Sequence, residues 1–202
     1  RMNKQLDDAI KMKLCDYVIL NNEQQTAFER YIQAGGGYVG IHAATDTEYE
    51  WPWYNRMVGA WFLDHPSTPS NVQKGKFYVT KKNDLTAGMP DEFERTDEFY
   101  SFKDISPKIN VVLKIDEKSY IGGKNGADHP ISWFQDFDGG RSFYTAMGHT
   151  DATFAEPLFL NHLWAGIKYA MGGETPKTVD FSKSKPEENR FTKVVLEEKL
   201  DE

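Results

Sequence analysis

The stretch CDYVILNNEQQTAFERYIQAGGGYVGIH, residues 15–42, decides the fold class. It starts with a short apolar run, residues 15–20, whose β-favouring side chains predict a buried strand. Asn22, with Gln25 three residues later, resembles a helix-capping box, and the apolar residues that follow recur on one helical face. Glycines at 35–37 end this helix and lead into a second apolar strand at 38–42. The pattern predicts a β-α-β unit.

Strands that are apolar throughout must be covered on both faces, so this unit predicts an α/β fold with a mainly parallel sheet between helices. The segment 51–62, WPWYNRMVGAWF, places three large apolar side chains four residues apart and predicts a helix. Beyond it the chain has no long helical pattern before residue 157. Strands are predicted at 75–81, 99–102, 109–115, 131–137 and 141–146, and Asp138-Gly139-Gly140 predicts an antiparallel hairpin between the last two.

A last helix is predicted between Pro157, which suits a first helical turn, and Gly172-Gly173. We therefore expect one α/β domain over residues 1–173. The segment 174–202 is charged, with scattered apolar residues, and predicts a tail or linker. Its short apolar patch FTKVVL, 191–196, also fits the first strand of a following module.

Composition excludes several classes of function. The 24 basic and 31 acidic side chains give a net charge of −7, which repels a phosphate backbone and excludes nucleic acid as a partner. No apolar run approaches the roughly 18 residues of a membrane span, so we expect no membrane insertion. The single cysteine, Cys15, cannot form an internal disulfide. It begins its predicted strand, away from the edge where ligands bind, which argues against a thiol nucleophile.

Histidines beside predicted strand ends are the main candidates for function. His42 closes one strand and His149 follows another, and ligands bind at the carboxyl ends of strands in an open α/β sheet. Pro66 and Pro130 hold the histidine before each of them in an extended backbone. Imidazoles with carboxylates nearby suit acid–base catalysis or a divalent metal such as zinc. The candidate metal ligands are His42, His65, His129 and His149, and the accompanying carboxylates are Asp46, Asp64, Asp128 and Asp151.

Each of these patterns also has a purely structural interpretation. Asp-His-Pro is ordinary turn chemistry, and no close-spaced pair of metal ligands such as HxH occurs in the sequence. Residues 40–44 have the strand-to-helix setting of a nucleophile elbow, but His42 stands where a serine or cysteine would be needed. His162 lies in a helical pattern and is predicted to be a packed or partly exposed helix residue. Aromatic side chains near the loops suit either a sugar surface or the core: Trp51, Trp53, Tyr54, Trp61, Phe99, Tyr100 and Trp133.

Five segments match one family in the same order. They are GGGYVGIHAATDTEYEWPWY (35–54), DHP (64–66), ERTDEFYSF (94–102), GADHPISWFQDFDGGRSFYTAMGHTD (126–151) and FLNHLWAGIKYAMG (159–172). Over about residues 14–172 the chain resembles the ThuA-like family, named for trehalose utilisation, in the class I glutamine amidotransferase-like superfamily. The resemblance implies a flavodoxin-like three-layer α/β/α domain of bacterial origin, with a role in sugar metabolism or in handling plant or microbial glycans.

The resemblance also implies which residues of this chain occupy the polar positions of the family, and which catalytic residue the family lacks. The family has no amidotransferase cysteine, so a cysteine glutaminase is not expected. It has a further first strand and a longer loop near residue 21, so we expect the N-terminal edge of the site to be incomplete here. The positions implied are His42, Asp46, His65, Asp97, Glu98, His129, His149 and Asp151.

The C-terminal sequence PEENRFTKVVLEEKLDE, 186–202, resembles the junction that joins such domains to a β-propeller sugar dehydrogenase-like module. This resemblance implies a fused or associated partner of that kind. It also favours a periplasmic or exported location over a cytoplasmic one.

Two hypotheses of function follow from the sequence. The first is an enzyme that acts on a sugar, such as a keto-glycoside, with His42 and His149 as the proton-transfer pair and Asp46, Glu98 and Asp151 beside them in the catalytic set. A divalent metal is an open alternative for the same histidines. The second hypothesis is a non-catalytic carbohydrate-binding or docking module. The predicted substrate-binding residues are Trp53, Asp97, Tyr100, Asp128 and His129.

Overall fold

The computed structural model describes residues 22–184, so the predicted strand at 15–20 and the patch at 191–196 lie outside the described residues. Helices and strands alternate at first, and strands then dominate until the last long helix. In chain order the elements are α2 (Asn22–Gln33), β1 (Gly37–Ile41), α3 (Pro52–Val58), β2 (Trp61–Asp64), β3 (Val72–Val79), β4 (Glu92–Glu98), β5 (Ser101–Lys103), β6 (Asn110–Asp116), β7 (His129–Phe137), β8 (Gly140–Thr145) and α4 (Pro157–Met171).

Six strands form the main sheet in the order β1-β8-β7-β6-β3-β4. Strand β1 pairs with β8 in parallel, and the other neighbours in this sheet are antiparallel. Strands β2 and β5 form a separate antiparallel pair. The α/β fold class is confirmed, although antiparallel pairs outnumber the parallel pair among the described residues.

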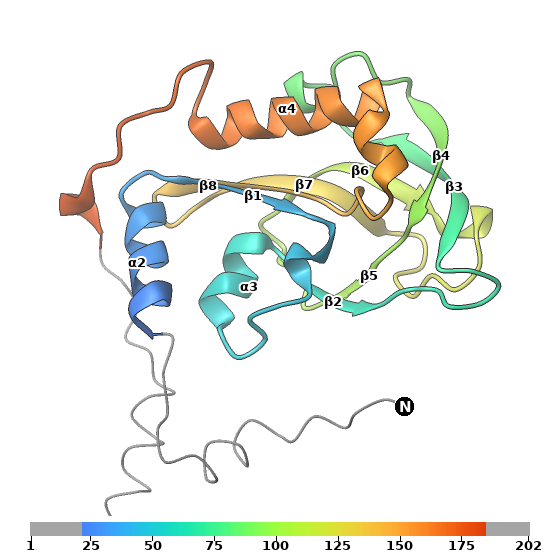
Figure 1. Cartoon of the computed structure of the whole chain (residues 1–202), viewed down its shortest axis with the longest axis horizontal. Helices are drawn as coiled ribbons and strands as arrows, with labels where there is room; N and C mark the ends of the chain where they lie inside the picture. The colour runs from blue at the N-terminus through green and yellow to red at the C-terminus, as the bar shows by residue number, and fades with distance from the viewer. Residues whose placement is uncertain (1–21, 185–202) are drawn as a thin grey trace, which may run out of the picture.

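Helices cover both faces of the main sheet, with α4 on one side and α2 and α3 on the other (Figure 1). The contact of α4 depends on Gly166, because a Cβ atom there would lie 2.3 Å from the ring of Phe143 in β8. Phe143 is fully buried, and the next residue, Tyr144, is equally buried. Since successive strand residues face opposite sides, these two rings fill the two layers of core.

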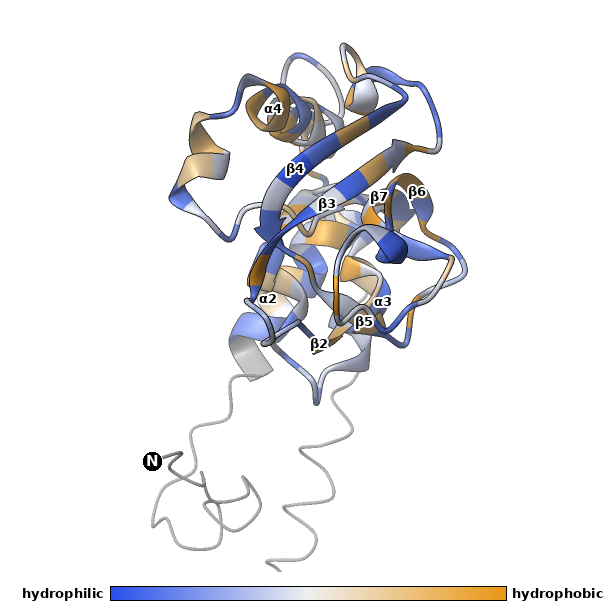
Figure 2. Cartoon of the chain, turned by 90° about the vertical axis from the view of Figure 1, so that its right-hand side faces the viewer, coloured by the Kyte–Doolittle hydropathy of each residue, from blue (hydrophilic) through white to orange (hydrophobic). Residues whose placement is uncertain are grey.

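The prediction of a helix over residues 51–62 is wrong beyond Val58, where α3 ends. Gly59 has a left-handed backbone, φ 103°, and its N–H donates to the carbonyl of Asn55, which closes the helix. The chain then enters β2. Strand β4 was not predicted, because its sequence EFERTDE is mostly charged; Figure 2 shows it as largely hydrophilic.

The hairpin and the last helix are confirmed. Phe137 pairs with Gly140 across a two-residue turn in which Asp138 and Gly139 both have positive φ, 46° and 92°, as a tight β-hairpin turn requires. Helix α4 begins at Pro157 and ends before Gly172, whose left-handed backbone caps it.

After α4 the described part of the charged segment folds back towards α2 (Figure 1). The backbone N–H of Asp180 donates to the carbonyl of Ala34, at 2.7 Å. Among residues 22–184, no helix has the length and apolar composition needed to cross a membrane.

Candidate functional site

Two imidazoles and one carboxylate converge at one point of the molecule. His42 Nε2 lies 3.0 Å from Glu98 Oε2, and His149 Nδ1 lies 3.2 Å from each of these two atoms. His42 follows β1, Glu98 is the last residue of β4, and His149 lies in the loop after β8. Within residues 22–184 this is the group of histidine, cysteine and carboxylate side chains whose ligand atoms are close enough to hold a metal ion.

The sheet must curl to bring these residues together, because β1 and β4 are its two outer strands. Glu98 and His42 are almost fully buried at the point where the edges meet, whereas the side chain of His149 is 36% exposed. Solvent therefore reaches the cluster on the side of His149.

His42 stands at a strand-to-helix turn, the setting in which a nucleophile elbow places its nucleophile. Its φ is 46°, in the left-handed region, and it is the first residue of the 3-10 helix His42–Thr45, which directly follows β1. Nδ1 of His42 lies 2.8 Å from the carbonyl oxygen of Ala146, which can only accept, so Nδ1 carries a hydrogen. In the neutral ring Nε2 then presents a lone pair to Glu98 Oε2, which is also an acceptor. A proton or a cation between them would turn this contact into an attraction.

The second oxygen of Glu98 is held by the loop between β2 and β3. Asn71 donates from Nδ2 to Glu98 Oε1 at 2.8 Å, and His65 Nδ1 lies 3.5 Å from the same oxygen. His65 therefore joins the edge of the cluster. Nothing in the sequence marks Asn71, which is a single polar residue in a polar loop.

Asp97 holds the backbone of the loop that carries His149. Its Oδ1 accepts from the N–H of His149 at 3.1 Å, and its Oδ2 accepts from the N–H of Gly148 at 2.9 Å. Arg95 and Thr153 also bind Oδ2, at 3.2 and 3.1 Å. Asp97 is fully buried, so this residue positions the loop instead of facing a substrate.

Tyr100 packs directly against the cluster. Its ring centroid lies 4.1 Å from that of His42 and 4.4 Å from that of Phe62. Burial, together with the negative charges of Glu98 and Asp46, raises the pKa of Tyr100 to about 12. The group is therefore a neutral hydrogen-bonding hydroxyl at ordinary pH.

His129 does not join the cluster. It is fully buried; Nε2 lies 2.8 Å from the carbonyl oxygen of Tyr100, and Nδ1 lies 2.7 Å from Glu117 Oε1. Burial lowers the pKa of His129, against the raising effect of its partners. With both ring nitrogens engaged, His129 supports the backbone of Tyr100.

Two other predicted substrate-binding residues also lie elsewhere. Trp53 is 1% exposed and donates from Nε1 to Asp138 in the β7–β8 hairpin, at the opposite end of β1 from His42. Asp128 is exposed and forms an ion pair with Lys114. The sequence pattern does not show which way such side chains point.

The remaining predicted carboxylates lie on the surface. Asp46 accepts from the hydroxyl of Tyr49 at 2.5 Å, and Asp151 lies exposed in the first turn of the 3-10 helix Asp151–Ala155. His162 is packed, as predicted: it is 1% exposed, its Nδ1 donates to the carbonyl of Leu85, and burial lowers its pKa to about 4.

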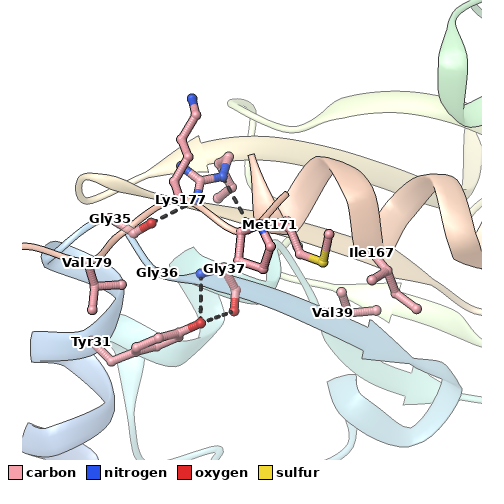
Figure 3. Close-up of a pocket in the computed structure, with 12 residues that line it drawn as sticks. Tyr31, Gly35, Gly36, Gly37, Val39, Ile167, Met171, Lys177 and Val179 are labelled. Carbon is pink, nitrogen blue, oxygen red and sulfur yellow. Dashed lines mark hydrogen bonds between the residues drawn. The ribbon is translucent and has the colours of Figure 1, made fainter. Parts of the chain in front are cut away.

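A pocket of about 180 Å³ lies away from this cluster, between the start of β1 and the end of α4. Figure 3 shows Tyr31 at its wall, with its hydroxyl beside the backbone of Gly37. Gly37 is at the opposite end of β1 from His42. This pocket is therefore separate from the candidate site.

The fold and the cluster define an α/β domain with a two-histidine, one-carboxylate site at the meeting edges of its sheet. Comparison with protein families gives the family: the model for ThuA, described as trehalose utilisation, matches residues 6–170. The chain belongs to the ThuA family. This confirms the resemblance found in the sequence and is consistent with the class I glutamine amidotransferase-like superfamily.

Solved structures show the same relationship. A ThuA-like protein from Bacteroides uniformis is 25% identical, with a TM-score of 0.59, and the match covers 74% of this chain and 66% of that one. A ThuA-like protein from Parabacteroides merdae is 21% identical, with a TM-score of 0.58, and the match covers 86% of this chain and 78% of that one. No protein of curated function matches the chain. Membership of the ThuA family supports a role in sugar metabolism.

Proposed function

We propose that this chain is an enzyme that acts on a sugar, such as a keto-glycoside, and that the reaction takes place at His42, Glu98 and His149. The convergence of these three side chains, with ligand atoms within 4.8 Å of one another, carries the proposal. Family membership supplies the substrate class.

The donor set favours a divalent cation such as zinc, because two imidazole nitrogens and one carboxylate oxygen are a common ligand set for catalytic zinc. A cation bound there would supply Lewis-acid chemistry to a sugar oxygen or to a bound water. Ala146 fixes the ring of His42, and Asn71 fixes the carboxylate of Glu98, so the donors are preorganised. Without a bound cation, the more exposed His149 is the imidazole that a sugar reaches first, and it would be the one to exchange a proton with the substrate.

Two measurements on the same protein test this function. Zinc binding is followed by calorimetry, and turnover is assayed with trehalose, other glycosides and their keto derivatives, with and without a chelator. We expect zinc binding and chelator-sensitive turnover in the parent chain. Glu98→Gln, His149→Ala and His42→Asn should each lower zinc affinity at least about 10-fold and abolish most turnover.

Asp128→Asn is the matched control, because Asp128 is a surface carboxylate paired with Lys114. Equal zinc affinity and equal turnover in the site variants and the parent would refute the proposal. Sugar binding without turnover, more sensitive to aromatic than to histidine replacement, would favour the non-catalytic binding module instead.

The same proposal includes a partner and a location. A sugar dehydrogenase-like module, fused or associated, would supply keto-sugars to this domain, and both would work in the periplasm or outside the cell. Co-purification of such a dehydrogenase with the native protein, and fractionation of the native host, test these two points. Recovery of the protein alone from the cytoplasm would contradict them.

A further inference from the structure

The ring of Tyr100 is packed between other side chains, whereas its hydroxyl has no hydrogen-bond partner among the described residues. The ring lies between His42 and Phe62, and the ring of His65 stacks beside it at 6.1 Å with an interplanar angle of 19°. The residue is 6% exposed. Its aromatic faces are thus occupied by protein side chains, which leaves little ring surface for stacking on a sugar.

The hydroxyl of Tyr100 differs from those of the other buried tyrosines. Tyr54 donates to the carbonyl of Ala44 at 2.7 Å, Tyr144 donates to the carbonyl of His42 at 2.7 Å, and Tyr120 lies 3.1 Å from Nδ1 of His129. Tyr100 has no hydrogen-bond partner for its hydroxyl within residues 22–184. Its oxygen is also not among the sealed, unpaired polar atoms of the interior, so solvent reaches it.

The ring of Tyr100 is packed, but its hydroxyl is free to bond to a molecule that enters from solvent. The side chain cannot easily turn away, because its ring is packed against the rings of His42, Phe62 and His65. It lies beside two of the three side chains of the cluster: its ring contacts that of His42, and the negative charge of Glu98 acts on its hydroxyl and raises its pKa. A hydroxyl beside the cluster, unpaired within the protein and reached by solvent, is therefore available to a molecule that binds at the cluster.

The geometry points to Tyr100 as a substrate-binding residue whose hydroxyl bonds to an oxygen of the sugar, a hydroxyl or a keto oxygen, when the sugar occupies the His42–Glu98–His149 site. This inference rests on the proposed function. It assigns the hydroxyl, not the aromatic ring, as the part of Tyr100 that recognises the sugar.

The test compares Tyr100→Phe with the parent chain. The variant keeps the ring that packs on His42 and removes one oxygen. We expect kcat/KM for the glycoside or keto-glycoside that the parent turns over to fall about 10-fold or more. Zinc affinity and resistance to urea should be unchanged. Tyr169→Phe, which removes a hydroxyl that donates to Asp136, is the control and should keep full activity.

A second arm identifies the oxygen. Monodeoxy derivatives of the same substrate are assayed with both proteins, and the derivative that lacks the oxygen bound by Tyr100 should be handled equally by parent and variant. Unchanged kcat/KM in Tyr100→Phe would overturn the inference while leaving the proposed function intact. An equal loss of zinc affinity would also overturn it, because it would show that the hydroxyl supports His42. If the parent neither binds nor turns over any sugar of the panel, both the proposed function and this inference fail.

Discussion

His42 Nε2 lies 3.0 Å from Glu98 Oε2, although the two residues adjoin the strands at opposite edges of the main sheet. A cation bound between them would connect these edges. It would bind the folded chain only, because the unfolded chain does not bring residues 42, 98 and 149 together.

Zinc should therefore stabilise the protein. With free zinc at about 100 times its dissociation constant, we expect the free energy of unfolding to rise by about 2.7 kcal/mol. Urea denaturation with zinc and with a chelator measures this difference. In Glu98→Gln, whose zinc affinity should be at least about 10-fold lower, the rise should be about 1.4 kcal/mol or less. A rise as large as that of the parent would place the zinc elsewhere.

Asn71→Ala should weaken zinc binding without removing a ligand. The amide of Asn71 holds Glu98 Oε1 at 2.8 Å, and loss of such a supporting hydrogen bond lowers metal affinity about 10-fold to 100-fold. Calorimetry against Ser70→Ala, an exposed neighbour in the same loop, provides the comparison. Equal affinities would show that Glu98 needs no support from this loop.

Asp97→Asn should destabilise the whole domain. The substitution leaves the buried guanidinium of Arg95 with only the more exposed Glu156 as carboxylate partner, and it puts an NH₂ group where N–H donors converge. Breaking a buried ion pair costs about 3–5 kcal/mol of unfolding free energy, measured here by urea denaturation. Asp128→Asn, at a surface ion pair, should change little. A small effect of Asp97→Asn would mean that the Gly148–His149 loop is held by other contacts.

His162 should make stability depend on pH. Burial lowers its folded pKa to about 4 from an ordinary value of 6.5, so the unfolded chain takes up a proton first as the pH falls. The contribution is complete above pH 6.5 and is lost between pH 6.5 and 4, up to about 3 kcal/mol. His162→Gln should flatten the plot of unfolding free energy against pH in that window. A slope equal to that of the parent would contradict the assignment.

Gly166→Ala should destabilise the packing of α4, although alanine favours a helix. The added Cβ would lie 2.3 Å from the ring of Phe143. We expect an overpacking cost of about 1–3 kcal/mol, measured by chemical denaturation. The double variant Gly166→Ala with Phe143→Leu should cost less than the sum of the two single changes. Additive costs would show that the two residues do not share one packing contact.

The sequence predicted those parts of the fold that follow a regular pattern. Helices α2 and α4, strand β1 and the β7–β8 hairpin have apolar periodicity, capping residues or glycine turns, and the structure has each of them. Strand β4 was not predicted, because its charged residues obscure the alternation of apolar and polar side chains that is typical of a strand. Strand β2 was not predicted, because WFLD continues an apolar run that also fits a helix. In the structure the left-handed Gly59 separates helix α3 from strand β2.

The site was predictable in part for the same reason. His42 and His149 stand where predicted strands end, so position along the chain indicated their place in the fold. Glu98 was indicated by family resemblance alone, and Asn71 by nothing. His129 begins β7 and is directed into protein contacts with Glu117 and Tyr100. The orientation of such a side chain depends on tertiary packing, which the local sequence does not determine.

The left-handed backbone of His42 decides which replacement can be used to study it. Most side chains pay a conformational cost at φ 46°, whereas asparagine tolerates that region at least as well as histidine does. An alanine variant would therefore combine the loss of the imidazole with a distorted turn, and its defects could be ascribed to either. Asparagine separates chemistry from conformation, and a glycine variant, which adopts the turn freely but offers no donor atom, completes the comparison.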